Sequence, residues 1–565
     1  MNQNQDRGIW SSKIGFIMAA AGSAVGLGNI WRFPYMTGMH GGAAFVLIYL
    51  FFVLMLGLPI MLNELVVGRR TNLNPVGALE TLRPGTQWKL VGGLGVLTGF
   101  GILSFYSVIA GWTVGYIYKS IIWGWIEPVP QDQLAQVFQD FTESPVNSIG
   151  LLLVFMALTM AVVYRGVKDG IERWSKILMP ILLGVLVLLI IRGVTLPNAE
   201  VGIKFYLKPD FSKITGEILI EALGQAFFSL SLGMGAMITY GSYLSKNDNL
   251  VTSGISVCLF DTLIALLAGM AILPAVFALG QEPTQGPNLI FVVLPAIFMK
   301  MPAGSILGPL FFFLLTIAAL TSTVSLLEVV TAYFVDEKGW KRQKAVIIVG
   351  SICAVFSALA ALSFGISDGL SNLPIINMGF FDILDMLFAK YSLTIGALLL
   401  AVFVGWRWGI KNATDEVTSG NAGFRGIGST VWGLIIRFLA PLLIILLIID
   451  SLKLDENYKL IAGILGYVLI EGFVVWFGTK FIAKIPATLH RTLLLPIVRL
   501  LFLVILGPVL LLIPFAGWGL VAILAIGLYY ILLYLILDVP QNKIFIPLGV
   551  ITILEIIVFA GYKFL

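Results

Sequence analysis

Long apolar segments alternate with short polar loops along most of this chain. Crossing roughly 30 Å of hydrocarbon takes about 20 helical residues. Segments of that length are unlike the ten-residue alternating strands of an outer-membrane barrel. The pattern therefore predicts an all-α polytopic membrane protein. The predicted membrane helices are 13–37, 43–69, 89–124, 148–165, 173–194, 216–245, 250–279, 305–335, 342–363, 372–408, 428–451 and 458–479, followed by three further apolar runs at 493–513, 517–537 and 544–562.

Glycines interrupt two of the predicted helices near their middles. The first helix contains GSAVGLGN (22–29), and the sixth contains LGMG (232–235). Unwinding a backbone in hydrocarbon strands N–H and C=O groups, so a break persists where an ion, a ligand or protein groups complete it. Freed carbonyls can coordinate a hard cation, and N–H groups at a half-helix amino terminus attract a carboxylate. Alternatively, the glycines only allow neighbouring helices to pack closely.

The two interruptions occupy corresponding places in two halves of the chain. Each half contains five predicted helices, an odd number, so the second half would lie inverted in the membrane relative to the first. Broken helices at matching positions indicate an inverted-repeat transporter with its site at the midplane. We therefore expect an inverted five-helix repeat of helices 1–5 and 6–10, with helices 1 and 6 broken. Helices 11–12 and about three extra carboxy-terminal helices would follow.

Loop charges predict the orientation of the chain. The loop after the second helix carries Arg69, Arg70, Arg83 and Lys89, whereas the loop 126–146 has no Lys or Arg. Positive loops stay on the cytoplasmic side, so we expect a cytoplasmic amino terminus in the cytoplasmic (inner) membrane. The polar start leads directly into the first helix, and we expect no cleavable signal peptide.

Composition excludes several other classes of protein. With 59% hydrophobic residues, a water-soluble fold would have nowhere to bury its apolar surface. The net charge of +5 lies in short loops and is no sign of nucleic-acid binding. Cys258 and Cys353 each stand alone, which excludes a disulfide framework. The sequence has no P-loop, Gly-x-Ser-x-Gly elbow or His/Glu metal-ligand spacing, so it predicts neither an ATP-driven pump nor an enzyme.

The motifs around these breaks carry a family resemblance. GSAVGLGNIWRFPY (22–35), LPIMLNELVVGR (58–69), RGVKDGIERWSKILMP (165–180), GQAFFSLSLGMGAMITYGSYL (224–244) and AALTSTVSLLEVVTAYFVDE (318–337) resemble the neurotransmitter:sodium symporter family. Within that family the chain is most similar to the bacterial leucine transporter and related prokaryotic amino-acid symporters. The resemblance covers about residues 7–480, in order and with matching spacing.

The resemblance implies two sodium ions. The first would be bound by the Ala24 carbonyl, the side chains of Asn29, Ser229 and Asp261, and the carboxylate of the substrate. Oxygen ligands of this kind suit a hard cation.

The second implied sodium site uses neutral oxygens only. Its ligands would be the carbonyls of Gly22, Val25 and Ala318 and the hydroxyls of Thr321 and Ser322. Taken alone, these two hydroxyls would more often bond back to a carbonyl one helical turn earlier.

The resemblance also implies a substrate pocket at the breaks. Tyr106, which alone would be an ordinary packed tyrosine, would cap the substrate carboxylate. Gly26 stands where monoamine carriers of the family have an aspartate, so an amino acid that brings its own carboxylate fits better. Met234 replaces a phenylalanine of the leucine transporter, and its more deformable thioether predicts tolerance of larger, aromatic substrates. The implied lining residues are Ala24, Gly26, Ile102, Tyr106, Phe228, Ser229, Ser231, Met234, Ser322 and Leu326.

Two sets of charged residues match the gates of the family. Arg32 and Asp385 match the outer gate, and Arg7 with Trp10 against Asp336 matches the inner gate. Charges near membrane ends are otherwise snorkelling side chains or ordinary loop pairs. Arg32 lies well inside a predicted helix, where an arginine is costly and normally functional.

Asp261 departs from the family pattern. It falls where the family usually has a sodium-binding asparagine, and Ala265 falls where chloride-dependent members have a serine. Two sodium ions and a zwitterion leave excess positive charge in a poorly solvated cavity. We therefore expect Asp261 to be both ligand and countercharge, which makes transport independent of chloride and allows proton uptake on the return step. Otherwise Asp261 simply pairs with a neighbouring polar group.

Together these features predict sodium-coupled symport of a neutral, hydrophobic or aromatic amino acid by alternating access. A membrane sensor of the same fold that binds an amino acid without turnover is the alternative, and a channel is a second one. The expected partners are the amino acid and membrane lipid but no nucleic acid, with a homo-oligomer left open. The expected regions are a cytoplasmic segment (1–12), the repeat core (13–409), helices 11–12 (410–485) and an extra membrane segment (486–565).

Overall fold

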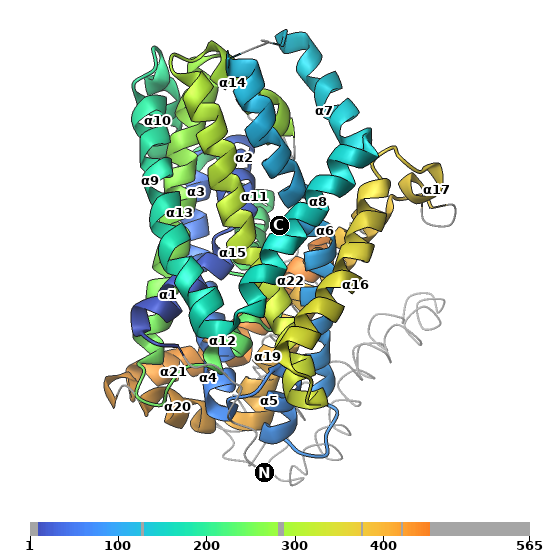
Figure 1. The fold of residues 1–565 in the computed structure, drawn as a ribbon. Coiled ribbons are helices and arrows are strands. Elements are labelled where there is room, and N and C mark those ends of the chain that lie inside the picture. Colours follow the sequence, from blue (N-terminus) through green and yellow to red (C-terminus); the bar gives the residue numbers. More distant parts are fainter. Residues whose placement is uncertain (1–9, 126–128, 281–287, 374–376, 420–421, 452–565) are drawn as a thin grey trace, which may run out of the picture. The chain divides into compact units, whose positions relative to one another are not determined.

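The computed structural model describes residues 10–125, 129–280, 288–373, 377–419 and 422–451, and these are helical with no β-strand among them (Figure 1). Nine helices of the described part are long and apolar enough to cross a membrane, and the bent first helix makes ten. The predicted helix 458–479 and the runs 493–513, 517–537 and 544–562 lie outside the described residues.

The first five-helix repeat begins with the broken helix. Its helices are α1 (Lys13–Ala24) with η1 (Gly28–Arg32) and α2 (Phe33–Met39); α3 (Ala43–Phe52), η2 (Val53–Gly57) and α4 (Leu58–Thr71); α6 (Lys89–Trp125); α8 (Pro145–Tyr164); and η4 (Val167–Glu172) with α9 (Arg173–Val194).

The second repeat follows the same order and also begins with a broken helix. Its helices are α11 (Gly216–Ser229) and α12 (Ala236–Gly241); α13 (Leu250–Ala278); α15 (Gly304–Lys338); α16 (Arg342–Leu362); and the continuous series α18 (Phe380–Leu384), η7 (Asp385–Ser392), α19 (Leu393–Val402), η8 (Phe403–Gly409) and α20 (Ile410–Thr418). After it come α21 (Ile427–Leu434), η10 (Ile435–Leu439) and α22 (Ala440–Ser451).

Both predicted breaks are confirmed. The first helix leaves the α-conformation at Val25, and its two parts are bent by 58°. In the sixth helix, Ser231, Gly233 and Gly235 have φ values of 53°, 88° and 75°. Such positive angles favour glycine. Gly233 also has no room for a side chain, since an added Cβ would lie 2.0 Å from the Leu393 carbonyl oxygen.

Short helices occupy connections that the hydrophobic pattern left as loops. They are α5 (Pro75–Leu82), α7 (Leu134–Glu143), α10 (Ala199–Leu207), and η6 (Leu289–Val293) with α14 (Leu294–Lys300). The apolar stretch 289–300 is too short to cross a membrane, so its hydropathy does not predict a membrane helix. In Figure 1, α7 and α14 lie at the upper end of the bundle, opposite α5 and α20.

The tenth predicted helix, 372–408, differs most from the structure. The helix starts only at Phe380, after the extended Gly379, and continues to Thr418. Gly409, with φ of 99°, looks like an end but is followed directly by α20. The fifth helix, in contrast, begins earlier than predicted, because the π-helical segment η4 precedes Arg173.

Corresponding helices of the two repeats pack against each other. The long helices α6 and α15 are third in their repeats and run along one another. The fourth helices, α8 and α16, also pack together, and α13 contacts both α4 and α9. Helix α1 packs between α9, α13 and α15, so its broken end faces the interior of the bundle.

Candidate functional site

Three polar side chains from three helices meet at the first break. The amide Nδ2 of Asn29 donates to Asp261 Oδ1 at 2.7 Å and to Ser229 Oγ at 3.0 Å, and Ser229 Oγ donates to Asp261 Oδ2 at 2.6 Å. All three are buried. The structure therefore brings together the side chains that the sequence suggested for the first sodium site, and it supports the register that placed Asp261 there.

The chemistry of this cluster fits a hard monovalent cation. It offers a carboxylate, an amide oxygen and a hydroxyl, which are the donors that such cations take. Among the described residues, no lysine or arginine forms an ion pair with Asp261. A buried carboxylate without a counterion is costly, so a cation in this place would stabilise the structure. Asn29 Oδ1 also accepts from the Gly26 N–H at 3.0 Å, which ties the cluster to the unwound backbone.

Two polar neighbours of this cluster were not predicted from the sequence. The Tyr49 hydroxyl donates to Ser229 Oγ at 3.3 Å, and Gln225 Nε2 donates to the Gly28 carbonyl at 3.3 Å. Gln225 lies four residues before Ser229 and therefore on the same helix face, a spacing that could have revealed it. Tyr49 had no such signal, because one hydroxyl in an apolar helix is an ordinary observation.

The candidate oxygens of the second sodium site converge less completely. Ser322 Oγ donates to the carbonyls of Val25 and Ala318, at 3.2 Å each. Thr321 Oγ1 donates to the Ala318 carbonyl at 3.0 Å. Gly22 lies against the Thr321 side chain, since an added Cβ would be 3.2 Å from Thr321 Cβ.

The two hydroxyls thus bond back to a carbonyl of their own helix, as isolated helix-face hydroxyls would. Ser322 differs because its hydroxyl also reaches the Val25 carbonyl at the break. A hydroxyl that only bonds back within its own helix would not make this contact between two helices.

The candidate substrate site lies where the break in the first helix meets α6 and α15. The Leu27 N–H donates to Tyr106 Oη at 2.9 Å. A Cβ added to Gly26 would lie 2.7 Å from Ser322 Oγ and 2.8 Å from Tyr106 Oη. Glycine is therefore required at position 26 for these hydroxyls to approach the backbone.

The other candidate wall residues lie around this point, and all of them except the half-buried Phe228 are buried. Ser231 Oγ donates to the Ser23 carbonyl at 3.1 Å, which links the two breaks directly. Phe228 packs against Gly28, where an added Cβ would be 2.8 Å from the ring. The remaining buried candidates are Ala24, Ile102, Met234 and Leu326.

Glu64 holds the break in the sixth helix from the side. Its Oε1 accepts from the Gly233 N–H at 2.6 Å, and the residue is fully buried. A carboxylate thus satisfies a backbone donor that the unwound segment exposes. Glu64 belongs to the first repeat, but its carboxylate stabilises the break in the first helix of the second repeat.

Trp10 lies directly before α1 and covers the start of the first helix. Its Nε1 donates to the Tyr240 carbonyl at 3.0 Å, and its ring makes edge contacts with Tyr240 and Tyr243. Asp336 accepts from the backbone N–H of Asn74 at 2.9 Å. Arg7 lies outside the described residues, so its pairing with Asp336 stays a prediction.

Above the break, Arg32 faces a candidate wall residue. Its guanidinium carbon lies 4.8 Å from the centre of the Phe228 ring, a cation–π distance. Asp385 begins η7. Within the described residues, no ion pair joins Arg32 to Asp385, and their pairing as an outer gate stays a prediction.

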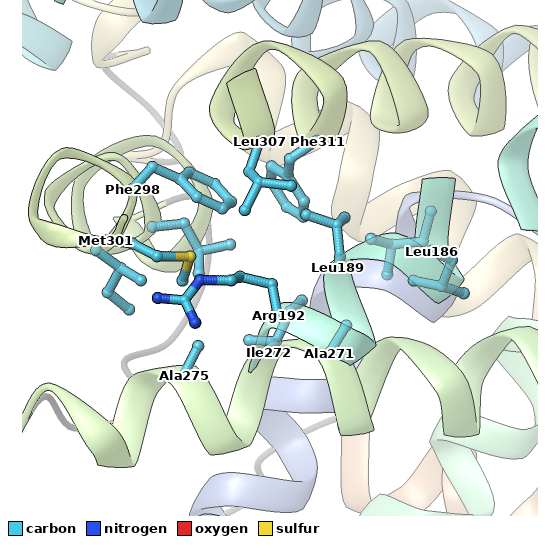
Figure 2. Close-up of a pocket in the computed structure, with 13 residues that line it drawn as sticks. Leu186, Leu189, Arg192, Ala271, Ile272, Ala275, Phe298, Met301, Leu307 and Phe311 are labelled. Atoms are coloured by element: carbon cyan, nitrogen blue, oxygen red, sulfur yellow. The ribbon is translucent and has the colours of Figure 1, made fainter. Parts of the chain in front are cut away.

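A small apolar cavity of about 20 Å³ lies near Ile30, between α9, α13, α14 and α15. Figure 2 shows the Arg192 side chain inside it, with the guanidinium beside Met301 and Ala275. Such a volume holds about one water molecule. The cavity is too small for an amino acid, and none of the candidate substrate residues lines it.

Comparison with known proteins gives one consistent result. Residues 7–128 and 131–464 match the model of the "Sodium:neurotransmitter symporter family". The chain is 41% identical over 441 residues to the uncharacterized sodium-dependent transporter YhdH of Bacillus subtilis, which covers 78% of this chain and 97% of the relative. It is 37% identical over 461 residues to an uncharacterized sodium-dependent transporter of Haemophilus influenzae, covering 80% of this chain and 99% of the relative.

A solved structure is similar as well. The crystal structure of MhsT in complex with L-phenylalanine superposes with a TM-score of 0.72 at 44% identity. The match covers 79% of this chain and 100% of MhsT.

Proposed function

This chain belongs to the sodium:neurotransmitter symporter family, whose members are sodium-dependent transporters and not enzymes, and from that premise we propose that it carries out sodium-coupled symport of a neutral, hydrophobic or aromatic amino acid. The observation that carries the proposal is the meeting of Asn29, Ser229 and Asp261 at the break in the first helix. A buried cluster of oxygen donors beside unwound backbone suits simultaneous binding of a cation and an amino-acid carboxylate.

The substrate carboxylate would bind at Gly26 and Tyr106. The Tyr106 hydroxyl accepts from Leu27 N–H and still has its own proton to donate to the carboxylate. Gly26 has no side chain to compete for this position. The substrate would therefore be an amino acid and not an amine.

The substrate side chain would lie among Ile102, Phe228, Met234 and Leu326. These walls are apolar, and burying a charged side chain there would be costly. Met234 deforms more readily than a ring, and the similar MhsT was crystallised with L-phenylalanine. Both observations support a large apolar side chain, including an aromatic one.

Two sodium ions would accompany the substrate. The first would be bound at Ala24, Asn29, Ser229 and Asp261, with Asp261 as the countercharge that replaces chloride. The second would be bound by Gly22, Val25, Ala318, Thr321 and Ser322.

Alternating access would open the site to one side of the cytoplasmic membrane at a time. The lower end in Figure 1, with α5 and α20, would face the cytoplasm, in agreement with the basic loop that contains Arg69 and Arg70. Arg32 and Asp385 would form the outer gate, and Arg7, Trp10 and Asp336 the inner one.

Uptake into vesicles tests the proposal. The purified chain is reconstituted in liposomes, and accumulation of radiolabelled phenylalanine is measured with and without an inward sodium gradient. A symporter concentrates phenylalanine above the outside level only with the gradient. Sodium-dependent binding without accumulation would identify a sensor, and simple equilibration a channel, so either result would overturn the proposal.

A further inference from the structure

Two side chains of the fifth helix, Glu172 at the end of η4 and Met179 in α9, lie against two glycines of α1, which form a lower and an upper notch. Gly15 faces Glu172, since an added Cβ would lie 2.0 Å from Glu172 Oε1. Gly22 faces Met179, whose Sδ would be 3.3 Å from an added Cβ. Each pair is seven residues apart on its own helix, so the two contacts follow one helix face. Only glycine at these positions lets the two helices approach so closely.

The lower notch is occupied by a carboxylate. Glu172 Oε2 accepts from the Ser11 N–H at 2.7 Å, and Oε1 accepts from Ser11 Oγ at 2.6 Å and from Ser12 Oγ at 3.0 Å. The Glu172 side chain is only 2% exposed. One carboxylate therefore takes three hydrogen bonds from the two residues that precede α1.

These contacts fix the start of the first helix. Ser12 is the N-cap of α1 and its Oγ accepts from the Gly15 N–H at 3.1 Å. The same hydroxyl donates its proton to Glu172, so cap and carboxylate are linked. The negative charge also lies at the positive end of the α1 dipole. Hydrogen bonds to a charged group contribute more than neutral ones.

The upper notch reaches the second candidate sodium site. Gly22 lies between Met179 of α9 and Thr321 of α15. If α1 swings away from α9 at its lower end, Glu172 loses Ser11 and Ser12, and Gly22 moves from Thr321. The Glu172 contact and the second sodium site are thus parts of one helix interface.

We propose that Glu172 is a positioning residue that holds the first half of the broken helix closed on the cytoplasmic side, and that its release from Ser11 and Ser12 is a required step of inward opening. The inference rests on the proposed alternating access. It adds a second attachment of α1, on η4, to the contacts that Trp10 makes with the residues around α12.

The position of Glu172 suits a reversible contact. It ends η4, next to the polar residues Lys168 and Asp169, and its partner Lys176 is 37% exposed. A carboxylate released here is rehydrated at the membrane surface and not stranded in hydrocarbon. The contact therefore contributes to the closed state without making opening prohibitive.

Distance measurement between spin labels tests the inference. Labels are attached to cysteines at Ile14, which is 64% exposed on α1, and at the exposed Gln343 on α16, in a full chain whose buried Cys258 and Cys353 are replaced by alanine. With sodium and phenylalanine, Glu172→Gln should raise the ratio of the long to the short distance roughly tenfold, as expected for loss of one charged hydrogen-bond set.

Lys176→Gln is the matched control. Lys176 contacts the same carboxylate at 2.6 Å but leaves Ser11 and Ser12 in place. We expect it to change the distance ratio by less than about twofold, since Lys176 is 37% exposed and water can take the place of its ammonium group beside the carboxylate. An equal effect of Glu172→Gln and Lys176→Gln would overturn the inference, because the distance ratio would then not depend on the hydrogen bonds between Glu172 and α1.

A double-mutant cycle separates positioning from general destabilisation. Gly15→Ala should open the inner side as Glu172→Ala does, because its methyl group displaces the carboxylate. In the Glu172→Ala background the same methyl group has room, so the double variant should resemble Glu172→Ala. Additive effects would contradict the proposal. The Ser11→Ala/Ser12→Ala chain, which keeps Glu172, gives the same comparison if a Glu172 variant does not fold.

The distance ratio reports helix position and not transport. Should vesicles fail to accumulate phenylalanine while Glu172→Gln still opens the inner side, only the proposed function fails. Should accumulation occur while the variant keeps the wild-type distance distribution, only the role of Glu172 fails.

Discussion

The amide of Asn29 donates a hydrogen bond to the carboxylate of Asp261 at 2.7 Å across 232 residues of sequence. This contact joins the break of the first repeat to the second helix of the second repeat. Ser229, at the end of α11, completes the triangle. The cluster can therefore form only when the two repeats are correctly packed, so cation binding at this point would stabilise one arrangement of both broken helices.

Asp261 should make the transporter independent of chloride. We expect phenylalanine uptake to be unchanged when gluconate replaces chloride, because the carboxylate already supplies the negative charge. Asp261→Asn should raise the sodium concentration for half-maximal phenylalanine binding roughly tenfold, since a charged ligand is replaced by a neutral one. Uptake into vesicles measures the effect of gluconate. Scintillation-proximity binding over a sodium series measures the effect of Asp261→Asn. Wild-type uptake that stops without chloride would refute this role.

Gly26→Ala should weaken phenylalanine binding at least roughly tenfold, as expected when a buried close approach is blocked. The new Cβ would lie 2.7 Å from Ser322 Oγ and 2.8 Å from Tyr106 Oη, so both hydroxyls must move. Gly93→Ala in α6 is the control, because an added Cβ there meets no atom within 4 Å. Calorimetric binding that is the same for both variants would show that Gly26 does not border the substrate.

The sequence predicted the breaks because their cause is local. Gly233 and Gly235 adopt positive φ angles, and glycine clusters in apolar helices show such positions directly. Asp261 could also be predicted from the sequence, since a lone carboxylate in an apolar helix is conspicuous. Tyr49 could not be predicted, because only the folded chain shows that its hydroxyl lies beside Ser229.

Helix boundaries were predictable only where polarity changes. Gly409 interrupts the apolar pattern, yet the helix turns through a positive φ angle there and continues as α20. The segment 289–300 is apolar but shorter than a membrane crossing, so only packing against its neighbours shows that it is helical. Contacts between distant segments, such as Glu172 with Ser11, have no signature in local composition.

Met234→Phe should narrow the range of substrates. A phenylalanine ring at position 234 is more rigid than the thioether chain of methionine. We therefore expect the affinity for tryptophan to fall about tenfold more than the affinity for leucine, since the larger side chain loses more contacts. Competition against labelled leucine measures the order. If tryptophan, tyrosine and phenylalanine fail to compete in the wild type, the assumed large pocket is wrong.

Arg69 should be needed for stability at the lower end of the bundle. Its fully buried guanidinium donates to Glu416 Oε1 at 2.9 Å and to Ser419 Oγ at 2.9 Å, which ties α4 to α20. Arg69→Met removes these donors and leaves a buried carboxylate, a change that costs about 3–5 kcal/mol in buried pairs. Lys246, 2.9 Å from Glu416 Oε1, compensates in part. We expect a clear decrease of the melting temperature in detergent.

Arg425→Ala is the comparison for Arg69→Met, because Arg425 pairs with Asp415 at 2.8 Å while both side chains are more than half exposed. An exposed pair contributes at most about 1 kcal/mol, so this variant should melt close to the wild type. Arg69→Lys should not restore stability, since an ammonium group cannot make the several directed hydrogen bonds of the guanidinium. Equal melting temperatures of the Arg69→Met and Arg425→Ala variants would mean that the buried pair of Arg69 and Glu416 does not hold α20 to α4.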